Sequence, residues 1–388
     1  MIIGINASFV RKQNTGIGQV TLNFLRKLSE LKVQSGKLKD VELFLYLEEK
    51  LPKDIKLPKN FKTRVFLPKY KRDDLIRKIW WENYLLPKKI KEDKCDVFLS
   101  LYQSATIIKD AKHIMLVHDI IPKLFPKYLN NLRKKIYQML VHSAIKKADK
   151  IISISHRTEK DLIQHLSIDA AKISVAYIDV DEIYKKEVLE KESQRVLRKY
   201  KLKPGYILAG GGLEVRKNIK GVLEAYKILQ EKYGQAGWVP KLAVYGKLMP
   251  ELAPLVTDAE KIANELGIKK NVKLLDCVPQ NDLPVLYKNA SVFVYPSFYE
   301  GFGMPVLEAM NQGTPVLTSK TSSLPEVGSD AVLYCDPEKS DDIAAVIRNI
   351  LNNNHIKAAL SLKGKERATH FSWNKFVGKV MNIIKGLS

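Results

Sequence analysis

The chain has 388 residues, which is too long for one ordinary hydrophobic core and favours two domains of roughly 190 residues each. Hydrophobic residues make up 45% and charged residues 28%, as in a soluble globular protein. Three scattered cysteines without a C-x-x-C pair indicate neither a disulfide framework nor a zinc cluster, and no window resembles a signal peptide or a transmembrane helix. We therefore expect a cytoplasmic protein.

The formal net charge of +23 is spread unevenly. Residues 1–200 hold 41 Lys and Arg against 24 Asp and Glu, whereas the remaining residues hold 24 against 18. This asymmetry indicates that the first half faces a negative partner, such as anionic lipid, nucleic acid or an acidic acceptor. The alternative is a lysine-rich proteome with solvated lysines everywhere, which would be expected to charge both halves alike.

The first predicted elements are a buried strand at Ile2–Asn6, a loop with Gly16 and Gly18, and an amphipathic helix. This is the phosphate-facing arrangement of a doubly wound α/β domain. The third glycine of the dinucleotide fingerprint is absent, so a simple tight turn stays open as an interpretation. Further alternation predicts a parallel sheet covered on both faces. The expected strands are Val41–Tyr46, Thr63–Leu67, Asp96–Leu99, His113–His118, Lys150–Ile154 and Lys172–Tyr177, with helices at Leu75–Leu86 and Tyr128–Ala148.

Basic and aromatic residues interleave from 61 to 87, and a second basic set spans 123 to 135. Such segments can lie on a membrane surface, with aromatic rings at headgroup depth and basic side chains over anionic lipid. The competing interpretation is an ordinary helix with Trp80 and Trp81 in the core. The sequence favours neither.

His118 ends one predicted strand, at a loop where chemistry tends to lie. It is a candidate general base or sugar ligand, or else a strand-end histidine bonded to nearby backbone. Asp179 and Asp181 form a D-x-D pattern that holds a divalent ion in many transferases, but no second carboxylate cluster is near it in the sequence. We therefore predict no metal site there. The charged segment Lys185–Lys201 is predicted to be a linker.

The second half restarts the alternation with a strand, three successive glycines and a helix. Gly211 and Gly212 permit a close backbone approach, and Arg216 and Lys217 place two cations before a helix N-terminus. Guanidinium and ammonium groups suit a diphosphate, and a glycine turn with solvated basic residues is the alternative. The expected strands are Tyr206–Ala209, Leu242–Tyr245, Val272–Leu275 and Ser291–Tyr295.

The loop sequence E-G-F-G-M-P begins at Glu300 and follows the last of these strands. Its glycines free the backbone, and Pro305 suits the first turn of a helix, whose bare N–H groups form an anion site. Glu308 lies about one turn inside that helix and is also explained as a first-turn acid favoured by the helix dipole. An acid beside two glycines, by contrast, has no obvious packing role.

Together these residues carry a resemblance to a known family. The string from Glu300 to Glu308, with Gly-Thr-Pro-Val at 313–316, resembles the E-x7-E signature of the retaining glycosyltransferases of family 4. The other glycine loops, the basic pair at 216–217, the loop from 278 to 287 and the histidine at 118 also match, so the likeness covers essentially the whole chain. It is most similar to bacterial mannosyl- and rhamnosyltransferases of surface-polysaccharide assembly. The stretch 176–181 departs from the family pattern, so no catalytic role is expected there.

The resemblance implies a GT-B architecture, in which two Rossmann-like, doubly wound parallel-sheet domains face each other across a cleft. An acceptor-binding domain would span residues 1–185, and a sugar-nucleotide-binding domain would span residues 186–370. A helix within 371–388 would cross back to the first domain.

The resemblance also implies residue roles. Arg216 and Lys217 would neutralise the diphosphate leaving group in place of a metal. Glu300 would hold the sugar hydroxyls, Glu308 the ribose, and His118 would contact the donor sugar near its anomeric carbon. The implied catalytic residues are Glu300, Lys217, Arg216 and His118, and the implied substrate-binding residues are Gly16, Gly18, Gly211, Gly212, Val278, Phe302, Gly303, Met304, Pro305 and Glu308.

The implied activity is retaining, metal-independent transfer of a hexose, with mannose favoured, from a GDP- or UDP-sugar to a lipid-linked or saccharide acceptor, without a cofactor. Peripheral attachment to the inner face of the cytoplasmic membrane is a further expectation. A soluble transferase acting on a small acceptor, such as a sugar phosphate or inositol, is the alternative. A nucleic-acid-binding protein is a remote alternative that only the pI of 9.6 suggests, and no recognition motif accompanies it, so we expect no nucleic-acid partner.

Overall fold

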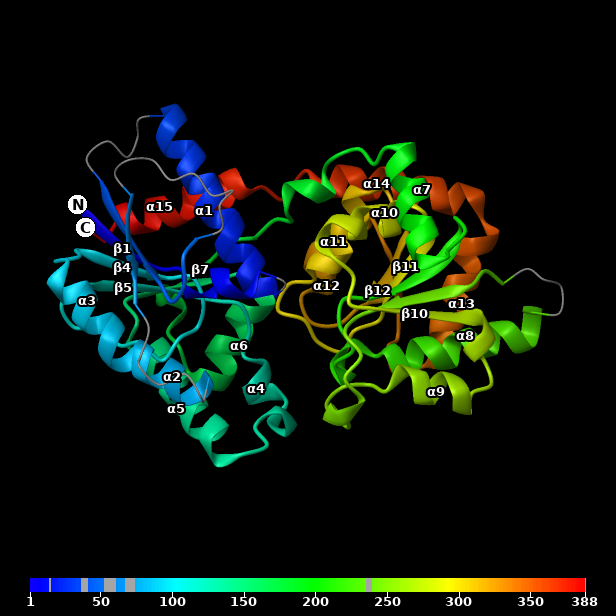
Figure 1. Cartoon of the computed structure of the whole chain (residues 1–388), viewed down its shortest axis with the longest axis horizontal. Coiled ribbons are helices and arrows are strands. Elements are labelled where there is room, and N and C mark those ends of the chain that lie inside the picture. Colours follow the sequence, from blue (N-terminus) through cyan, green and yellow to red (C-terminus); the bar gives the residue numbers. More distant parts are fainter. Residues whose placement is uncertain (14, 36–40, 52–60, 67–73, 235–238, 388) are drawn as a thin grey trace. The chain divides into compact units, whose positions relative to one another are not determined.

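The computed structural model describes all residues except 14, 36–40, 52–60, 67–73, 235–238 and 388. The chain divides into two compact units (Figure 1). The first unit takes residues 1–179 and 371–388, and the second takes residues 180–370. The sequence had placed this division six residues later, after residue 185. Each unit is described by itself below.

The first unit is built on a seven-stranded sheet in the order β3-β2-β1-β4-β5-β6-β7. All pairs are parallel, and Ile3 of β1 lies opposite Leu43 of β2 and Val97 of β4. Its central strands are buried on both faces, as their continuous apolar sequences predict. The strands are β1 (Ile2–Asn6), β2 (Glu42–Leu47), β3 (Phe61–Val65), β4 (Val97–Ser100), β5 (Lys112–Val117), β6 (Lys150–Ser153) and β7 (Ile173–Val175).

Helices cover both faces of this sheet, α1 and α15 on one and α2, α3 and α5 on the other (Figure 1). The final helix returns to the first unit, where the ring centroids of Phe376 and Phe24 lie 6.1 Å apart. Helix α2 continues through the π-helical turn η2 into α3. The helices are η1 (Ser8–Lys12), α1 (Gly16–Ser35), α2 (Asp74–Trp80), η2 (Trp81–Leu85), α3 (Leu86–Glu92), α4 (Ile121–Leu124), η3 (Pro126–Tyr128), α5 (Leu132–Lys147), α6 (His156–Leu166), η4 (Ala170–Lys172) and α15 (Trp373–Lys385).

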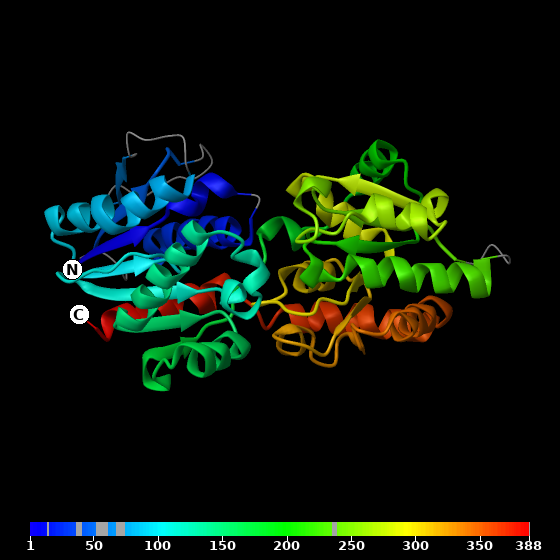
Figure 2. The same ribbon diagram turned by 90° about the horizontal axis from the view of Figure 1, so that it is seen from below.

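The second unit has a six-stranded parallel sheet, part of which is visible in Figure 2. The strand order is β10-β9-β8-β11-β12-β13. Its core gathers apolar side chains of the strands with those of α8 and α13, which pack against each other. The strands are β8 (Tyr206–Gly210), β9 (Leu242–Tyr245), β10 (Val272–Asp276), β11 (Ala290–Tyr295), β12 (Val316–Ser319) and β13 (Leu333–Cys335).

The helices of the second unit connect these strands and cover the sheet. They are η5 (Glu182–Tyr184), α7 (Glu190–Tyr200), η6 (Val215–Lys217), α8 (Ile219–Tyr233), η8 (Pro250–Leu252), α9 (Ala259–Glu265), η9 (Lys269–Asn271), η10 (Gln280–Asp282), α10 (Leu283–Lys288), α11 (Met304–Asn311), α12 (Leu324–Gly328), α13 (Ser340–Asn352) and α14 (Asn354–Ala368). Two doubly wound parallel-sheet units are therefore present, as the sequence predicts.

The predicted linker at 185–201 is wrong, because most of it forms helix α7. Val196 and Leu197 of α7 are buried, and the helix is anchored to Asp282. The carboxylate of Asp282 pairs with Arg195 at 3.1 Å and Lys199 at 2.5 Å and accepts a hydrogen bond from the hydroxyl of Tyr200 at 3.0 Å. High charge in this segment reflects one polar helix face and not an absence of structure.

The two neighbouring tryptophans of the first unit have different environments. Trp81 is fully buried and its indole N–H donates to the carbonyl of Phe66, whereas Trp80 is 51% exposed. The interpretation that places both tryptophans in the core therefore holds for Trp81 and is wrong for Trp80. Throughout the residues that the structure describes, no helix is both long and apolar enough to cross a bilayer.

Candidate functional site

The order of strands in the second unit places two loops side by side. After β8 the chain continues to β9 on one side of it, whereas β11 lies on its other side. In doubly wound sheets, ligands bind where the strand order reverses in this way, at the carboxyl ends of the strands. The glycine run and Arg216-Lys217 follow β8, and Glu300 follows β11. The topology therefore brings together residues that lie more than eighty positions apart.

The glycine run has a backbone that other residues rarely adopt. Gly210, Gly211 and Gly212 have φ values of +152°, +93° and +115°. A Cβ atom on Gly211 would lie 3.1 Å from the Cγ of Pro305, and one on Gly212 would lie 2.4 Å from the carboxylate of Glu214. These glycines let the β8 loop approach the start of α11.

Glu300 is the centre of a buried ion cluster. Its Oε1 atom lies 2.7 Å from Arg216 Nη1 and 3.2 Å from Lys217 Nζ. The same oxygen accepts hydrogen bonds from the hydroxyls of Tyr295 at 2.6 Å and Ser297 at 2.9 Å. Every one of these contacts falls on Oε1, and within the described residues Oε2 forms no hydrogen bond. One carboxylate therefore holds two cations through one oxygen.

Backbone hydrogen bonds fix the loops that carry this cluster. The amide of Phe298 donates to the carbonyl of Arg216 at 2.7 Å, and Arg216 Nη1 donates to the carbonyl of Tyr299 at 3.0 Å. Ser323 Oγ donates to the carbonyls of Glu300 and Phe302 at 2.9 and 2.8 Å. The cluster is preorganised by its own loops, as a charge-stabilising site requires.

Burial raises the pKa of the Glu300 carboxyl, but the attraction of Lys217 and Arg216 and the hydrogen bond from Tyr295 outweigh it and lower the pKa to about 2. For Arg216, burial lowers the pKa, and the attraction of Glu300 outweighs this and raises it above its ordinary value. Both groups therefore stay ionised at every physiological pH.

Glu308 lies on α11 in a different environment. It is buried, and its Oε2 atom accepts a hydrogen bond from the hydroxyl of Tyr287 at 2.8 Å, which in turn lies 2.5 Å from the hydroxyl of Tyr245. Burial is the main cause that raises its pKa to about 7, against the hydrogen bond from Tyr287 and the attraction of Lys217. The two acids of the motif thus differ in charge near neutral pH.

The start of α11 brings four more predicted residues to this place. Gly303 precedes the helix with φ +109°, and a Cβ there would lie 2.8 Å from the side chain of Leu324. Met304 and Pro305 form the first turn, and Phe302 is buried beneath it. Val278 follows β10 and, in the part of the chain with described coordinates, shares no hydrogen bond with the Glu300 cluster.

Sequence reasoning missed the role of Tyr295, and it placed Tyr287 in the matching loop from 278 to 287 without a hydrogen-bond partner. Tyr295 ends β11 and bonds both Lys217 and Glu300, and Tyr287 bonds Glu308. A tyrosine at the carboxyl end of a buried strand was the available signal, because a buried phenol needs a hydrogen-bond partner. Ser297 and Ser323 gave no such signal.

In the first unit, His118 follows β5 and is buried. Its Nε2 atom lies 3.0 Å from the carbonyl of Leu101, so that nitrogen carries the proton and Nδ1 is the acceptor. Burial lowers its pKa to about 4 despite this hydrogen bond. Such a neutral imidazole is a weak base at neutral pH, so the arrangement suits a hydroxyl ligand better than a general base.

Gly16 and Gly18 open helix α1 at the same edge of the first sheet as His118, since α1 follows β1. The side chain of Thr15 accepts from the amide of Gly18 at 3.1 Å. A Cβ on Gly18 would lie 2.0 Å from the carbonyl oxygen of Lys12, so the loop itself requires glycine there.

Asp181 accepts from the amide of Ile183 and so caps η5, and Asp179 is fully buried. Within the described ranges, no group of three or more His, Cys, Asp or Glu side chains is arranged to hold a metal ion.

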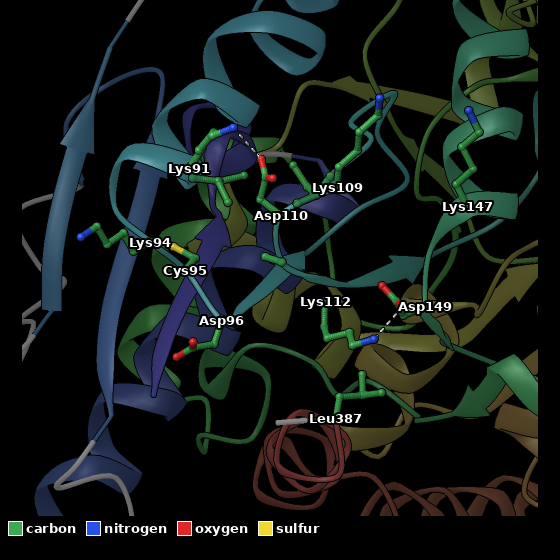
Figure 3. A pocket seen from close by; sticks show the side chains of 13 residues that line it. Lys91, Lys94, Cys95, Asp96, Lys109, Asp110, Lys112, Lys147, Asp149 and Leu387 are labelled. Atoms are coloured by element: carbon green, nitrogen blue, oxygen red, sulfur yellow. Dashed lines mark ion pairs between the residues drawn. The ribbon is translucent and has the colours of Figure 1, made fainter.

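A pocket of about 790 Å³ lies at the opposite, amino edge of the first sheet, beside the starts of β4, β5 and β6 (Figure 3). Lys91 pairs with Asp110 at 3.6 Å and Lys112 pairs with Asp149 at 3.7 Å within it. None of the predicted site residues lines this pocket. Its place in the fold is remote from the strand ends where His118 and the glycine loop lie.

Comparison with known proteins identifies the class to which this fold and site belong. The model of Glycosyltransferase Family 4 matches residues 15–182, and that of Glycosyl transferases group 1 matches residues 190–367. The O-antigen chain mannosyltransferase B of Escherichia coli is 34% identical over 279 residues, which cover 69% of this chain and 68% of that protein. The chain belongs to the glycosyltransferases of family 4, and its predicted enzyme class, a hexosyltransferase, is confirmed.

Two further proteins extend this comparison. The O-antigen chain mannosyltransferase RfbU of Salmonella typhimurium is 25% identical over 356 residues, which cover 89% of this chain and 90% of that protein. The solved structure of WaaG, a glycosyltransferase involved in lipopolysaccharide biosynthesis, is 17% identical and matches with a TM-score of 0.73 over 100% of both chains. The predicted fold class, with its two parallel-sheet domains, is confirmed.

Proposed function

We propose that this glycosyltransferase moves mannose from a nucleotide diphosphate sugar to a lipid-linked or saccharide acceptor in the assembly of a surface polysaccharide. The observation that carries the proposal is the Arg216–Lys217–Glu300 cluster at the strand-order reversal of the second unit. The names of the two mannosyltransferases to which the chain is similar support the sugar and the pathway class. GDP is the nucleotide that we favour.

Charge explains how the cluster would act on the donor. Arg216 and Lys217 carry two positive charges against the one negative charge of Glu300, so the cluster attracts an anion. A departing diphosphate gains negative charge as the bond to the sugar breaks, and these fixed cations would stabilise it in the role that a metal has elsewhere. Oε2 of Glu300 would accept a hydrogen bond from a hydroxyl of the sugar.

The proposed route is front-face attack with retention of configuration. The acceptor hydroxyl forms the new bond to the anomeric carbon while the bond from that carbon to the phosphate oxygen breaks. The hydroxyl proton passes to the departing phosphate. His118 accepts a hydrogen bond from the sugar through Nδ1 and takes no proton.

A thermal-shift panel of GDP-, UDP- and TDP-sugars, each with and without EDTA, tests this proposal. We expect stabilisation by one nucleotide class, led by GDP-mannose, that EDTA leaves unchanged. No stabilisation by any sugar nucleotide, or stabilisation that EDTA abolishes, would contradict it.

The raised pKa of Glu308 predicts how donor binding depends on pH. A carboxylate accepts hydrogen bonds from both ribose hydroxyls, and Glu308 is ionised only above its pKa of about 7. If only the ionised form binds well, the dissociation constant of GDP-mannose is about tenfold lower at pH 8 than at pH 6. Isothermal titration calorimetry between pH 6 and pH 8 measures this dissociation constant. A sugar nucleotide is the right probe because its phosphates, being diesters, do not titrate in this range.

Glu308→Gln is the matched variant for this experiment. Glutamine has nearly the same shape as glutamate but does not titrate. The variant should therefore bind GDP-mannose weakly, with a dissociation constant that does not change with pH. A variant that keeps the pH dependence of the wild type would show that another group causes it.

Peripheral membrane attachment is the second part of the proposal, and two apolar stripes on the first unit support it. Ile76, Trp80 and Tyr84, at helical spacing on α2–η2, are 50%, 51% and 60% exposed. Leu132, Ile136 and Met139 form a similar stripe on α5 and are 70%, 45% and 70% exposed. Helix α2 packs against α5, so the two helices that carry the stripes are neighbours (Figure 1). Exposed basic residues lie close by in sequence, namely Lys123, Lys127, Arg133 and Lys135.

Co-sedimentation with phosphatidylcholine vesicles, with and without phosphatidylglycerol, tests this attachment. Each basic residue near an anionic surface contributes about 1 kcal/mol, so binding is expected only to the anionic vesicles. Trp80→Ala/Met139→Ala should weaken it about tenfold, because it removes apolar surface from the interface. Leu362→Ala is the control, since Leu362 is 72% exposed on the second unit. Absence of binding by the wild type at moderate salt would instead favour a soluble transferase with a small acceptor.

A further inference from the structure

Two buried tyrosines lie behind Glu308, and the proposed transfer assigns no role to either. Tyr287 belongs to α10, and Tyr245 ends β9. The hydroxyl of Tyr287 donates to Oε2 of Glu308 at 2.8 Å, and the hydroxyls of Tyr287 and Tyr245 lie 2.5 Å apart. Because a phenol has one hydroxyl hydrogen and Tyr287 gives it to Glu308, Tyr245 is the donor in the second hydrogen bond. We call Tyr245 and Tyr287 the phenol relay.

Glu308 is a buried acid without a cation beside it. The carboxylate of Glu300 has two cations within 3.2 Å, whereas among the described residues no cationic side chain lies within 4.0 Å of the Glu308 carboxylate. A charge that is removed from water is costly unless it is paired or hydrogen-bonded. A hydroxyl that donates to the charged form stabilises it without adding a charge of its own. The phenol relay therefore takes the place of a counter-charge.

Other buried phenols of the second unit have ordinary backbone partners. The hydroxyl of Tyr206 donates to the carbonyl of Leu286 at 2.7 Å, and that of Tyr226 donates to the carbonyl of Pro240 at 2.9 Å. A buried phenol needs a hydrogen-bond partner, and a backbone carbonyl is enough for this purpose. The need of Tyr287 for a partner thus does not explain why its hydroxyl reaches a buried acid of the motif.

The relay also lies between the parts of the proposed donor site. A Cβ atom on Gly210 would lie 2.4 Å from the ring of Tyr245, so this ring packs against the first glycine of the β8 loop. The ring centroid of Tyr287 lies 5.1 Å from that of Phe293 on β11, and Phe293 stacks on Tyr295 at 5.7 Å. These contacts fix both rings, so the two hydroxyls are held in place by packing.

Several titratable groups act on the carboxyl of Glu308. Burial is the main cause that raises its pKa to about 7, and the hydrogen bond from Tyr287 is the main cause that opposes this rise. Lys217 of η6 and Tyr184 of η5 also lower this pKa, whereas Asp181 raises it. Loss of the Tyr287 hydroxyl should therefore raise the pKa of Glu308 further and reduce its ionised fraction near neutral pH.

We propose that the phenol relay positions Glu308, holding its carboxylate in place to accept the ribose hydroxyls of the donor. This inference rests on the proposed function, because it takes a ribonucleotide sugar as the ligand of Glu308. Both tyrosines act through Glu308, so they are positioning residues and not catalytic ones. Since the ribose does not react, donor binding should depend on the relay and the rate of sugar transfer should not.

Carbon-13 NMR of the glutamate carboxyl groups in the full, ligand-free chain tests the relay without any donor. Glu308→Gln identifies the resonance of Glu308 by its loss. Tyr287→Phe keeps the ring and removes only the hydroxyl. In this variant the titration midpoint of Glu308 should rise by about one pH unit, the usual contribution of a hydrogen bond to a charged group.

Calorimetric titration of GDP-mannose measures the consequence for binding. If only ionised Glu308 binds well, Tyr287→Phe should bind about tenfold more weakly than the wild type at pH 6 and within about twofold of it at pH 8.5. The KM for GDP-mannose should rise in the same way, whereas kcat should not change. Tyr245→Phe/Tyr287→Phe should bind like Tyr287→Phe alone, because Tyr245 acts only through the hydroxyl of Tyr287.

Tyr206→Phe is the matched control. It removes a buried phenol hydroxyl of the same unit, whose partner, Leu286, directly precedes Tyr287 on α10. The lost hydrogen bond should cost a similar amount of stability. Because no acid is involved, the variant should keep the wild-type titration midpoint of Glu308 and the wild-type dissociation constant at both pH values.

Three results would overturn the proposal. They are an unchanged midpoint of Glu308 in Tyr287→Phe, donor binding by that variant that is unchanged or equally weakened at pH 6 and pH 8.5, or an equal midpoint shift in Tyr206→Phe. The two readouts also separate the relay from the donor site. A raised midpoint in Tyr287→Phe, with no binding of GDP-mannose to the wild type, would contradict the proposed donor and leave the hold of the relay on Glu308 standing.

Discussion

Lys217→Met is expected to slow hexose transfer by about 10²–10³-fold, the usual loss when one preorganised charge contact to a transition state is removed. Lys217 Nζ is held by Glu300 and Tyr295 at the strand ends of the second unit. Methionine has a similar volume, and the ion pair of Arg216 and Glu300 stays balanced without the lysine. The second unit should therefore stay folded. Initial rates of transfer from GDP-mannose, or of donor hydrolysis where no acceptor is supplied, measure the effect.

Glu300→Gln should lose a similar factor in rate but also destabilise the second unit, because it leaves Arg216 and Lys217 buried together without a counter-charge. Glu265→Gln, an exposed acid of the same unit, is the control and should keep the wild-type rate. Wild-type rates of hexose transfer in both Lys217→Met and Glu300→Gln would show that the cluster takes no part in catalysis.

Glu82→Gln is expected to destabilise the first unit by about 3 kcal/mol, because it leaves the ammonium of Lys78 among three aromatic rings without its carboxylate. The carbonyl oxygen of glutamine can still accept from the amide of Ala105, and its NH₂ group can donate to the hydroxyl oxygen of Tyr102, so the loss is mainly that of charge. Since the chain has two units, the effect is measured by hydrogen exchange of amides in β1 and β4, with β8 and β11 as the internal reference.

The double variant Lys78→Met/Glu82→Gln separates charge from packing. Replacing both members of a buried pair is far less costly than removing one, so most of the stability should return. Glu92→Gln, an exposed acid of the same unit, should have no effect. If the double variant is as unstable as Glu82→Gln alone, loss of the ion pair between Lys78 and Glu82 is not the cause of the destabilisation.

Alternation of apolar strands and helices was enough to predict both parallel sheets, because strands buried on two faces are continuous apolar runs. The same reasoning failed where a helix is mostly polar. Residues 190–200 carry only a narrow apolar face, with Val196 and Leu197, and the ion pairs that dock this helix come from Asp282, far away in the sequence. The short strands β12 and β13 also gave too little pattern to be predicted.

The motif residues of the second unit could be predicted because loop chemistry is local: glycines, a proline and two acids at fixed spacing. The sequence could not tell that the polar contacts of the Glu300 carboxylate all fall on one oxygen, or that Glu300 and Glu308 have pKa values of about 2 and about 7. Those properties depend on Tyr295, Tyr287 and the β8 loop, which only folding brings together. Similarly, Lys78 and Glu82 lie in the basic and aromatic segment from 61 to 87, and only the fold places them against each other beside buried aromatic rings.

Calorimetric titration of GDP-mannose in the presence of EDTA, into the wild type and into Lys217→Met, tests the central claim most directly. One molecule of donor should bind the wild type, and Lys217→Met should bind it about 10- to 100-fold more weakly, since a charge-assisted contact contributes about 1.5–3 kcal/mol. Equal affinity in the two proteins, or no binding of any sugar nucleotide to the wild type, would contradict the assignment of the Arg216–Lys217–Glu300 cluster as the donor site.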